Sequence, residues 1–354
     1  MDDTTVHDFK KEDDKMKPRK ENESGLLPSY GNGMHSFKEL SLVFEKKFAY
    51  SHFPEQPQNL YDAAQYLLTL GGKRIRPVMC LMGNEMFDEI NEDAYHVATA
   101  IELFHNFTLI HDDIMDKAPL RRGMPTTHKK FGESTALLAG DVMLVVGYEN
   151  LSKVRADHLP KVITLFNRTA REVCEGQQFD MDFEKMPDVN FDDYLKMVTL
   201  KTSVALAASL RLGSILGGAG RDNQEHLYEF GKNLGIAFQV QDDYLDAFGN
   251  PEKFGKKQGG DIMANKKTFL LLQAMKVATN AQRKELDDLL KINDEKKIEG
   301  VLHIFRSCNV DEWAKELKQK YFSIAMDHLE EIAVLSARKK PLEGLASYLM
   351  ERDV

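Results

Sequence analysis

Apolar residues recur along most of the chain at the spacing of an α-helix. Four long runs, residues 59–70, 91–110, 134–154 and 223–248, place apolar side chains at positions i, i+3, i+4 and i+7. This spacing predicts helices that each bury one face. No segment alternates apolar and polar residues with a two-residue period between turn signals, so strands are not expected. The pattern therefore predicts an all-α protein.

Clusters of Gly and Pro, which mark turns, interrupt the helical pattern. They lie at residues 71–77, 117–133, 184–190, 216–223 and 249–261. No change of composition divides the chain after about residue 36, so we expect roughly ten or more helices in one large bundle spanning 36–354. Residues 134–148 and 197–216 are apolar nearly all round. We expect these two helices at the centre of the bundle or at a subunit interface.

Composition narrows the possible functions. The 354 residues carry a net charge of −9, which argues against nucleic acid or an anionic membrane as the main partner. Three well-separated cysteines without a C-x-x-C pair indicate reduced thiols. No stretch approaches the length of a transmembrane helix and no signal-peptide core is present, so a cytoplasmic location is expected. Residues 1–35 are rich in charge and poor in large apolar side chains, which predicts a disordered tail.

The motif DDxxD occurs twice, at residues 112–116 and 242–246. Each copy ends an apolar helical run, where the helix dipole makes carboxylates unfavourable. The first and last aspartates of each motif lie about 40° apart on an ideal helix, so both point from one stripe. The middle aspartates, Asp113 and Asp243, fall to one side.

Carboxylates that converge from two helices require cations between them. Two like charges 4 Å apart repel by roughly 4 kcal/mol at intermediate dielectric. Few, hard oxygen ligands suit Mg²⁺, which completes its coordination with water and substrate phosphates. Neither motif has an EF-hand loop, and the Glu-x-x-His pairs of a di-iron bundle are missing. The residues therefore favour Mg²⁺ with a diphosphate or triphosphate.

Basic residues suited to phosphate accompany both motifs. Arginine grips phosphate through two hydrogen bonds, whereas lysine acts as a movable point charge. No Walker-type or Rossmann glycine motif is present, which disfavours the common nucleotide-binding folds. The candidates are Lys73, Arg74 and Arg76 in "GGKRIRP", Arg121 and Arg122 after the first motif, and Lys256, Lys257, Lys266 and Lys267 after the second.

Taken in order, five motifs resemble those of the all-trans isoprenyl diphosphate synthases of the polyprenyl synthetase family. They are "GGKRIRP", "HDDIMDKAPLRRGMPTTH", "EGQQFD", "KT" at 201–202 and "FQVQDDYLDAFGNPEKFGKKQGGDIMANKKT". The resemblance covers about residues 40–350. It implies an all-α bundle around a deep central cavity, aspartate motifs on opposite walls of that cavity, and a homodimer.

The resemblance also implies site residues. Five aspartates match positions that hold Mg²⁺, with three ions expected per site: Asp112, Asp116, Asp242, Asp243 and Asp246. The positions that bind isopentenyl diphosphate are Lys73, Arg76, His105 and Arg122. Those that bind the allylic diphosphate are Arg121, Lys201, Gln239, Lys256 and Lys266. Gln177 and Thr202 match positions that line the reacting centre.

The implied reaction is ionisation of an allylic diphosphate (dimethylallyl, geranyl or farnesyl) followed by attack of the isopentenyl double bond and loss of a proton. Mg²⁺ and the basic residues stabilise the departing diphosphate, and oxygen atoms of Lys201, Thr202 and Gln239 are expected to steady the allylic cation. A dry apolar cavity protects that cation from water. The reaction needs no side-chain nucleophile.

Product length depends on the floor of the cavity. In the family that the chain resembles, bulky residues four and five positions before the first aspartate shorten the product, and here these are Thr108 and Phe107. One aromatic residue there, and no two-residue insertion in the first motif, favour a C15–C20 product. On an ideal helix Phe107 lies about 140° from Asp112, off the cavity face, and Phe104 at about 80° is another candidate floor.

We therefore expect geranylgeranyl diphosphate as the product, with farnesyl diphosphate or a longer polyprenyl diphosphate as alternatives. A terpene cyclase would lack the second DDxxD and "GGKRIRP". An inactive regulatory subunit would carry a degraded aspartate motif, whereas both motifs are intact in this chain.

Overall fold

The computed structural model describes residues 33–48, 52–249 and 258–351. Most of the predicted tail (residues 1–32) lies outside the described residues, as do Lys256 and Lys257. The described chain is helical almost throughout, which confirms the all-α prediction. The helices of its first half are α1 (Phe37–Phe48), α2 (Gln58–Thr69), α3 (Ile75–Glu85), α4 (Glu92–Met115), α5 (Thr127–Phe131), α6 (Glu133–Leu151), α7 (Leu159–Phe183) and α8 (Phe191–Val198).

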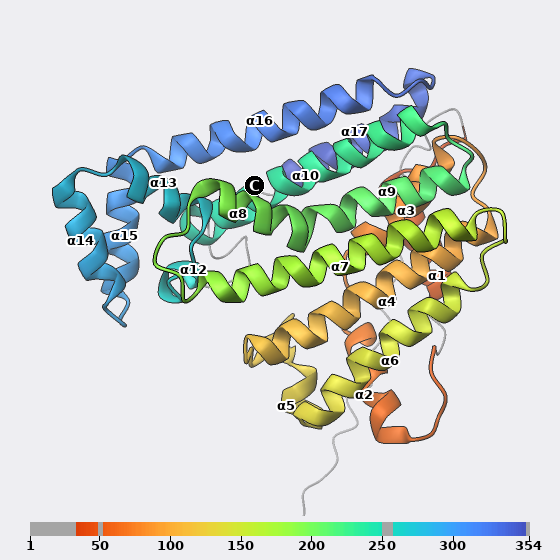
Figure 1. Cartoon of the computed structure of the whole chain (residues 1–354), viewed down its shortest axis with the longest axis horizontal. Coiled ribbons are helices and arrows are strands. Elements are labelled where there is room, and N and C mark those ends of the chain that lie inside the picture. The colour runs from red at the N-terminus through yellow and green to blue at the C-terminus, as the bar shows by residue number, and fades with distance from the viewer. Residues whose placement is uncertain (1–32, 49–51, 250–257, 352–354) are drawn as a thin grey trace, which may run out of the picture.

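A π-helical turn, η1 (Thr199–Ser203), joins α8 to the helices of the second half. These are α9 (Val204–Leu216), α10 (Arg221–Phe248), α12 (Gly260–Met263), α13 (Phe269–Val277), α14 (Asn280–Leu290), α15 (Lys296–Ser307), α16 (Val310–Glu330) and α17 (Ser336–Met350). The long helices α4, α7, α9 and α10 form the body of the bundle, α16 runs along one edge, and α14 and α15 project from one end (Figure 1).

The expectation that the chain has no strands was wrong at one small hairpin. The strand β1 (Leu120–Arg121) pairs antiparallel with β2 (Met124–Pro125). The two residues between them, Arg122 and Gly123, both have positive φ, at 55° and 77°, as a tight hairpin turn requires. Strands of two residues are too short to produce an alternating pattern, so the sequence carried no signal for them.

Local signals fix where α4 begins and ends. The side chain of Asn91 accepts a hydrogen bond from the Ala94 backbone N–H at 3.0 Å, and Glu92 and Asp93 complement the positive end of the helix dipole. The helix ends at Met115, two residues before Lys117 adopts a left-handed conformation. The first aspartate motif therefore occupies the last turn of α4.

Two apolar cores hold the bundle together, and α10 passes through both. Leu227, Phe230 and Leu234 in its first half belong to a core built mainly by α1–α4, α6, α7 and α9. Ile236 and Val240 in its second half belong to a core built with α8 and α13–α16. A shared helix is consistent with the single domain expected for residues 36–354, which stays a prediction.

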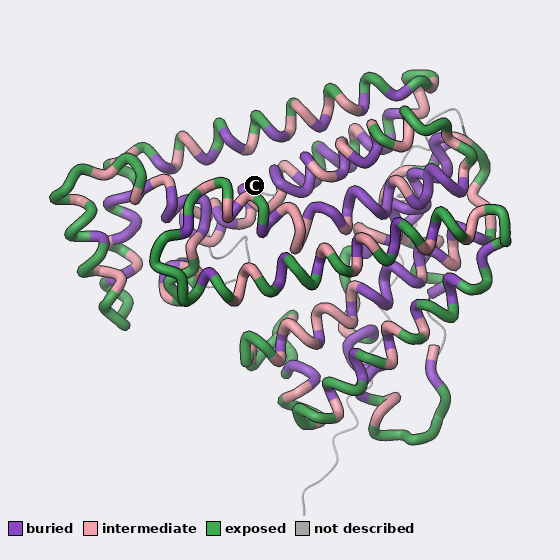
Figure 2. The backbone as a smooth tube through the Cα atoms, in the orientation of Figure 1, coloured by how far each residue is buried: buried purple, intermediate pink, exposed green. Residues whose placement is uncertain are grey.

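The two helical runs that are apolar all round occupy different places. In α9 every residue is buried except Ala205 and Arg211, because α3, α7 and α10 pack around it; the buried stretches are marked in Figure 2. This confirms a central position for most of the run 197–216. In contrast, α6 packs along α4 but leaves an apolar face exposed. None of the helices in the described ranges is both long and apolar enough to cross a bilayer.

Candidate active site

A cavity of about 440 Å³ lies between α4, α7 and α9, within the usual range of roughly 300–1,000 Å³ for small-molecule sites. One end of it is lined by polar side chains, among them Asp112, Gln177, Lys201 and Thr202. The other end is lined by apolar side chains: Ile101, Phe104, Phe166 and Leu212. The cavity is therefore a shaft with a charged mouth and an apolar floor.

A second hollow of about 260 Å³ adjoins the mouth of the shaft. It contains the second aspartate motif, Gln239 and Lys266, and it shares Lys201 and Thr202 with the shaft. The two residues of the "KT" motif therefore stand at the junction between the two aspartate motifs.

The π-helical turn η1 presents these two residues. Turns of this type often occur at functional sites because the extra residue redirects side chains. α7 passes very close to it: a Cβ atom on Gly176 would lie 2.3 Å from the Lys201 backbone nitrogen. Only glycine fits there, which gives a structural reason for the glycine in "EGQQFD".

The aspartates of the first motif play unequal parts. Asp112 lines the shaft. Its pKa is raised, mainly by burial and further by Asp116, although Lys201 offsets part of the rise. Asp116 is exposed at the end of α4. Asp113 is buried and accepts two hydrogen bonds of 2.8 Å from the Arg121 guanidinium. The structure thus places Asp113 to one side, as the helical wheel indicated, and Arg121 against it.

In the second motif the middle aspartate is again buried. Asp243 accepts hydrogen bonds from the Tyr194 hydroxyl at 3.0 Å and from the Gln239 side-chain amide at 2.9 Å. Burial, with a further contribution from Asp261, raises the pKa of Asp243 to about 8. Asp246 accepts a 3.0 Å hydrogen bond from the backbone N–H of Asp261, and Asp242 lines the hollow.

Two further acids belong to the site, Asp180 and Asp261. The Lys201 ammonium lies 2.6 Å from Asp180, and Asp261 lies 3.7 Å from Lys266. Burial alone would lower the pKa of Lys266, but Asp261, Asp180, Asp116 and Asp243 together raise it. Because both motifs act on one lysine, they face a common space. Sequence reasoning missed both acids, although each lies inside a motif that it had singled out.

The oxygen-only donor set suits a hard divalent cation. Among the residues that the structure describes, no three Asp, Glu, His or Cys side chains converge as a ready-made metal site. Mg²⁺ sites commonly contain only one or two protein carboxylates, with water and phosphate oxygens as the other ligands. Burial is the main cause of the raised pKa values of Asp112 and Asp243, and the neighbouring carboxylates Asp116 and Asp261 raise them further. A cation bound beside these groups would therefore stabilise their ionised forms.

Basic groups gather on one side of the mouth. Arg76 lies 3.3 Å from the His105 imidazole, and both residues line the shaft. Burial, and then Arg76 and Arg122, hold the pKa of His105 well below its usual value, so the imidazole is neutral. Lys73 is exposed. Arg74 points elsewhere, into a buried ion pair with Glu102.

All three predicted chain-length residues, Phe104, Phe107 and Thr108, line the shaft. The expectation that Phe107 faces away from the cavity was wrong. Its ring lies 4.6 Å from that of His111 and 5.8 Å from that of Phe104, centroid to centroid. The shaft is wide enough to be bordered by a broader arc of α4 than the single stripe that carries Asp112.

Comparison with known proteins agrees with this geometry. The sequence profile of the polyprenyl synthetase family matches residues 57–308. The chain belongs to this family. It is a prenyltransferase with the all-α fold of the isoprenyl diphosphate synthases, a family that uses divalent metal ions.

Its relatives include two archaeal enzymes. The short chain isoprenyl diphosphate synthase of Methanothermobacter thermautotrophicus is 36% identical over 298 residues, 84% of this chain and 91% of that one. The geranylgeranyl diphosphate synthase of Saccharolobus solfataricus is 36% identical over 314 residues, 87% and 93% of the two chains. A crystal structure of a geranylgeranyl pyrophosphate synthase superposes with a TM-score of 0.86 at 41% identity, covering 91% of this chain and 100% of that one.

Replacing Gly176 by alanine tests the contact between α7 and the π-helical turn. The added methyl group would overlap Lys201 and push the turn away from the mouth, and a misplacement of about 1 Å can lower turnover on the order of 100-fold. Initial rates of prenyl transfer measure the effect. Gly220→Ala is the control, because no atom lies within 4 Å of its Cβ position and its φ of −66° suits alanine. Equal rates for the two variants would contradict the assignment.

Proposed function

We propose that the protein condenses isopentenyl diphosphate with allylic diphosphates and releases geranylgeranyl diphosphate as its main product. The observation that carries this proposal is the shaft, which joins a charged mouth suited to two diphosphates to an apolar interior suited to a prenyl chain. Geranylgeranyl diphosphate synthases among the relatives support the same product.

The aspartates serve the allylic diphosphate. In this proposal three Mg²⁺ ions per site are held between the two aspartate motifs. The residues that hold them are Asp112 and Asp116 of the first motif and Asp242, Asp243 and Asp246 of the second. The bound metal supplies positive charge to the diphosphate as it departs. Lys201 and Lys266 lie within the same space and add their own charges. Arg121 and Lys256 belong to this group as well, and Asp113 orients the guanidinium of Arg121.

The second substrate meets the basic side of the mouth. The diphosphate of isopentenyl diphosphate is proposed to bind to Arg76, Arg122, Lys73 and the neutral His105. Each arginine can offer two parallel hydrogen bonds to phosphate oxygens, while a neutral imidazole adds a hydrogen bond without further charge repulsion.

Oxygen atoms near the junction steady the allylic cation. The side-chain oxygen of Gln177 is buried and has no hydrogen-bond partner in the described part of the chain, and Gln177, Thr202 and Lys201 lie together at the mouth. An acceptor oxygen that is already oriented, rather than one that must turn when charge develops, stabilises a cation without reorganisation.

The depth of the shaft sets the product. Ile101 lies eleven residues from Asp112, Phe166 eleven from Gln177, and Leu212 eleven from Lys201. At 1.5 Å per residue each separation corresponds to about 16 Å along a helix, so three helices place the floor at one level.

An extended prenyl chain can be compared with this depth. An extended polypeptide advances about 3.5 Å over three bonds, so the four chain bonds of a trans isoprene unit advance about 5 Å. Three units, as in a farnesyl chain, fit above the floor, whereas four do not. Farnesyl diphosphate is then the longest primer that fits, and elongation stops at C20.

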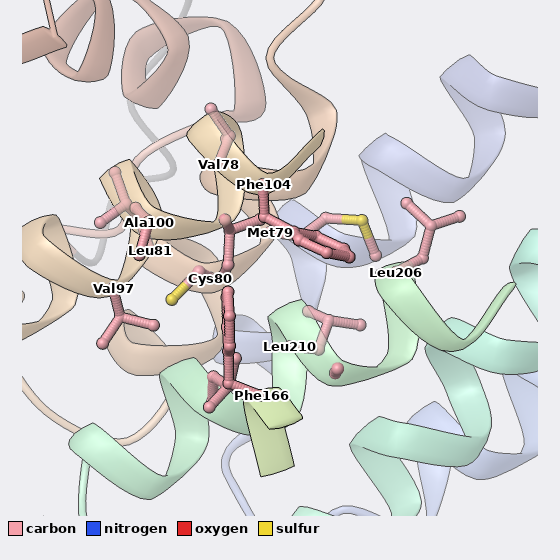
Figure 3. Close-up of a cluster of buried hydrophobic side chains, with 14 of the residues drawn as sticks. Val78, Met79, Cys80, Leu81, Val97, Ala100, Phe104, Phe166, Leu206 and Leu210 are labelled. Carbon is pink, nitrogen blue, oxygen red and sulfur yellow. The ribbon is translucent and has the colours of Figure 1, made fainter. Parts of the chain in front are cut away.

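The floor itself is aromatic. The ring of Phe166 lies 5.5 Å from that of Phe104 in an edge-to-face arrangement, and Tyr148 packs edge-to-face on Phe166 from behind, also at 5.5 Å. Figure 3 shows Phe104 and Phe166 in one cluster with Leu206 and Leu210 of α9. This bracing on both sides favours Phe166 with Phe104, rather than Phe107, as the limit to growth.

A second copy of the chain is the proposed partner of α6. Leu137, Leu138, Val145 and Tyr148 lie on its exposed face, and each is at least 37% exposed. On an ideal helix these four residues fall within an arc of about 100°, so they lie on one side of α6. Exposed apolar faces of this kind mark interaction sites, and a self-complementary face suits a two-fold homodimer.

Asp112→Asn tests the metal-binding role. Turnover should fall on the order of 10²–10³-fold or more, because the neutral amide cannot stabilise the metal that balances the leaving group. Melting temperature should stay the same or rise, since the carboxylate sits in surroundings that raise its pKa. Initial rates with labelled isopentenyl diphosphate and a thermal melt measure both, with Asp327→Asn on the exposed face of α16 as control. Near-normal turnover would remove Asp112 from the metal site.

Phe166→Ala tests the floor. Removing the ring should extend the shaft and give C25 and longer prenyl diphosphates, sized by chromatography after dephosphorylation. Phe305→Ala is the matched control, because it removes a buried ring from the other core at a similar cost in stability, roughly 3–5 kcal/mol. Longer products from Phe107→Ala but not from Phe166→Ala would move the floor to Phe107.

Val145→Glu tests the proposed dimer. A carboxylate in the middle of the α6 face should prevent association, giving a monomer by light scattering at concentrations where the parent protein is a dimer. Leu335→Glu adds the same charge at a position that is 77% exposed and should leave the assembly intact. A dimeric Val145→Glu protein would place the interface elsewhere.

A further inference from the structure

A buried carboxylate lies behind the basic side of the mouth. Glu102, on α4, is 3% exposed and pairs with the guanidinium of Arg74. The side-chain amide of Asn106, which is fully buried, donates a 3.0 Å hydrogen bond to the same carboxylate oxygen. Glu102 lies outside the five sequence motifs, and it does not line the shaft.

Its partner Arg74 is unlike the other basic residues of "GGKRIRP". It is 8% exposed, and it stands at the start of α3 with φ of 51° and ψ of 31°. This left-handed conformation is unfavourable for a residue with a side chain, so surrounding contacts must hold it. Besides Glu102, the guanidinium donates to the Leu68 carbonyl at 3.3 Å. The ion pair therefore fixes the turn from which α3, and with it Arg76, emerges.

Arg122 packs on the same turn. Its guanidinium lies 3.1 Å from the position that a Cβ atom on Gly72 would occupy. The turn thus contacts two arginines: Arg74, which pairs with the buried Glu102, and Arg122 of the β1–β2 hairpin. A displacement of the turn would move both arginines that are proposed to bind the diphosphate, Arg76 and Arg122.

Glu102 also balances charge. Three guanidiniums and an imidazole share this side of the mouth, and like charges at about 4 Å repel by roughly 4 kcal/mol at intermediate dielectric. Burial lowers the pKa values of Arg76 and Arg122, and the negative charge of Glu102 offsets part of this lowering. The buried carboxylate therefore favours the charged arginines in place before any diphosphate arrives.

We propose that Glu102 is a positioning residue for the diphosphate of isopentenyl diphosphate: through Arg74 it holds the turn 71–74 and keeps Arg76 and Arg122 aimed at the mouth. This inference rests on the proposed function of the site. Glu102 touches neither substrate, and its effect passes through the three arginines.

A merely structural ion pair would behave differently. Replacing one member of a buried pair usually destabilises a protein because the other charge is left uncompensated. Such a loss lowers the melting temperature without distinguishing between the two substrates. A positioning role instead changes the KM of one substrate and leaves the KM of the other.

The test is Glu102→Gln, which keeps the shape and the acceptor oxygen but removes the charge. We expect the KM for isopentenyl diphosphate to rise on the order of tenfold, while kcat and the KM for farnesyl diphosphate change by less than about twofold. Asp93→Asn is the matched control: Asp93 lies on the same helix, is 7% exposed and pairs with Arg155 at 3.2 Å, away from the shaft. It should lose stability with both KM values intact.

A second variant covers the case in which Glu102→Gln does not fold. Glu102→Gln combined with Arg74→Gln leaves no uncompensated buried charge, yet it still removes the anchor of the turn. The selective rise in the KM for isopentenyl diphosphate should therefore persist. A parental KM in the double variant, or equal changes in the KM of both substrates, would overturn the proposal.

A binding measurement separates this inference from the proposed function. Calorimetry with inorganic diphosphate alone, without metal, reports on the basic side of the mouth even if the parent protein condenses no prenyl substrates. Weaker binding by the folded variant than by Asp93→Asn supports the role of Glu102, and equal binding contradicts it. Absence of turnover in the parent protein would overturn the proposed function instead.

Discussion

The burial of ionisable side chains at the mouth of the shaft is the constraint on which this structure depends. Asp112 and Asp243 carry raised pKa values, and Arg76 and His105 carry lowered ones. Each group is therefore held in surroundings that oppose its charged form. The bundle tolerates this arrangement because α4, α9 and α10 are anchored by apolar cores along the rest of their length. In the proposed function, the acids then gain stability by binding metal, and the basic groups gain it by binding diphosphate.

Within this arrangement the middle residue of each aspartate motif supports the outer two. Asp113 orients Arg121, and Asp243 receives hydrogen bonds from Tyr194 and Gln239. Both lie about 100° from their neighbours on the helix and so reach a different element. The two motifs therefore differ at this position: Asp113 is occupied by Arg121, whereas Asp243 also lines the hollow beside Asp242 and Asp246.

Features written in local sequence could be predicted. The helices follow from apolar periodicity, and the separation of Asp113 from Asp112 and Asp116 follows from helix geometry alone. The features that could not be predicted depend on contacts between distant segments. The approach of α7 to Lys201 involves Gly176, twenty-five residues away, and the pair of Arg74 with Glu102 spans twenty-eight. Phe107 reaches the shaft although an ideal wheel placed it outside, because the width of a cavity depends on the helices opposite.

The floor shows most clearly why product length resists prediction from one helix. The sequence before the first aspartate motif contains Phe104 and Phe107, and both line the shaft. Which of them limits growth depends on what stands behind each ring. Phe104 meets Phe166 of α7, which is itself braced by Tyr148 of α6. A growing chain that reaches this level therefore meets two packed rings supported by a third, rather than one movable side chain. Phe107 packs on Phe104 and on His111, which is one turn nearer the mouth, and it forms part of the wall. The limit to growth is therefore a property of three helices at one level.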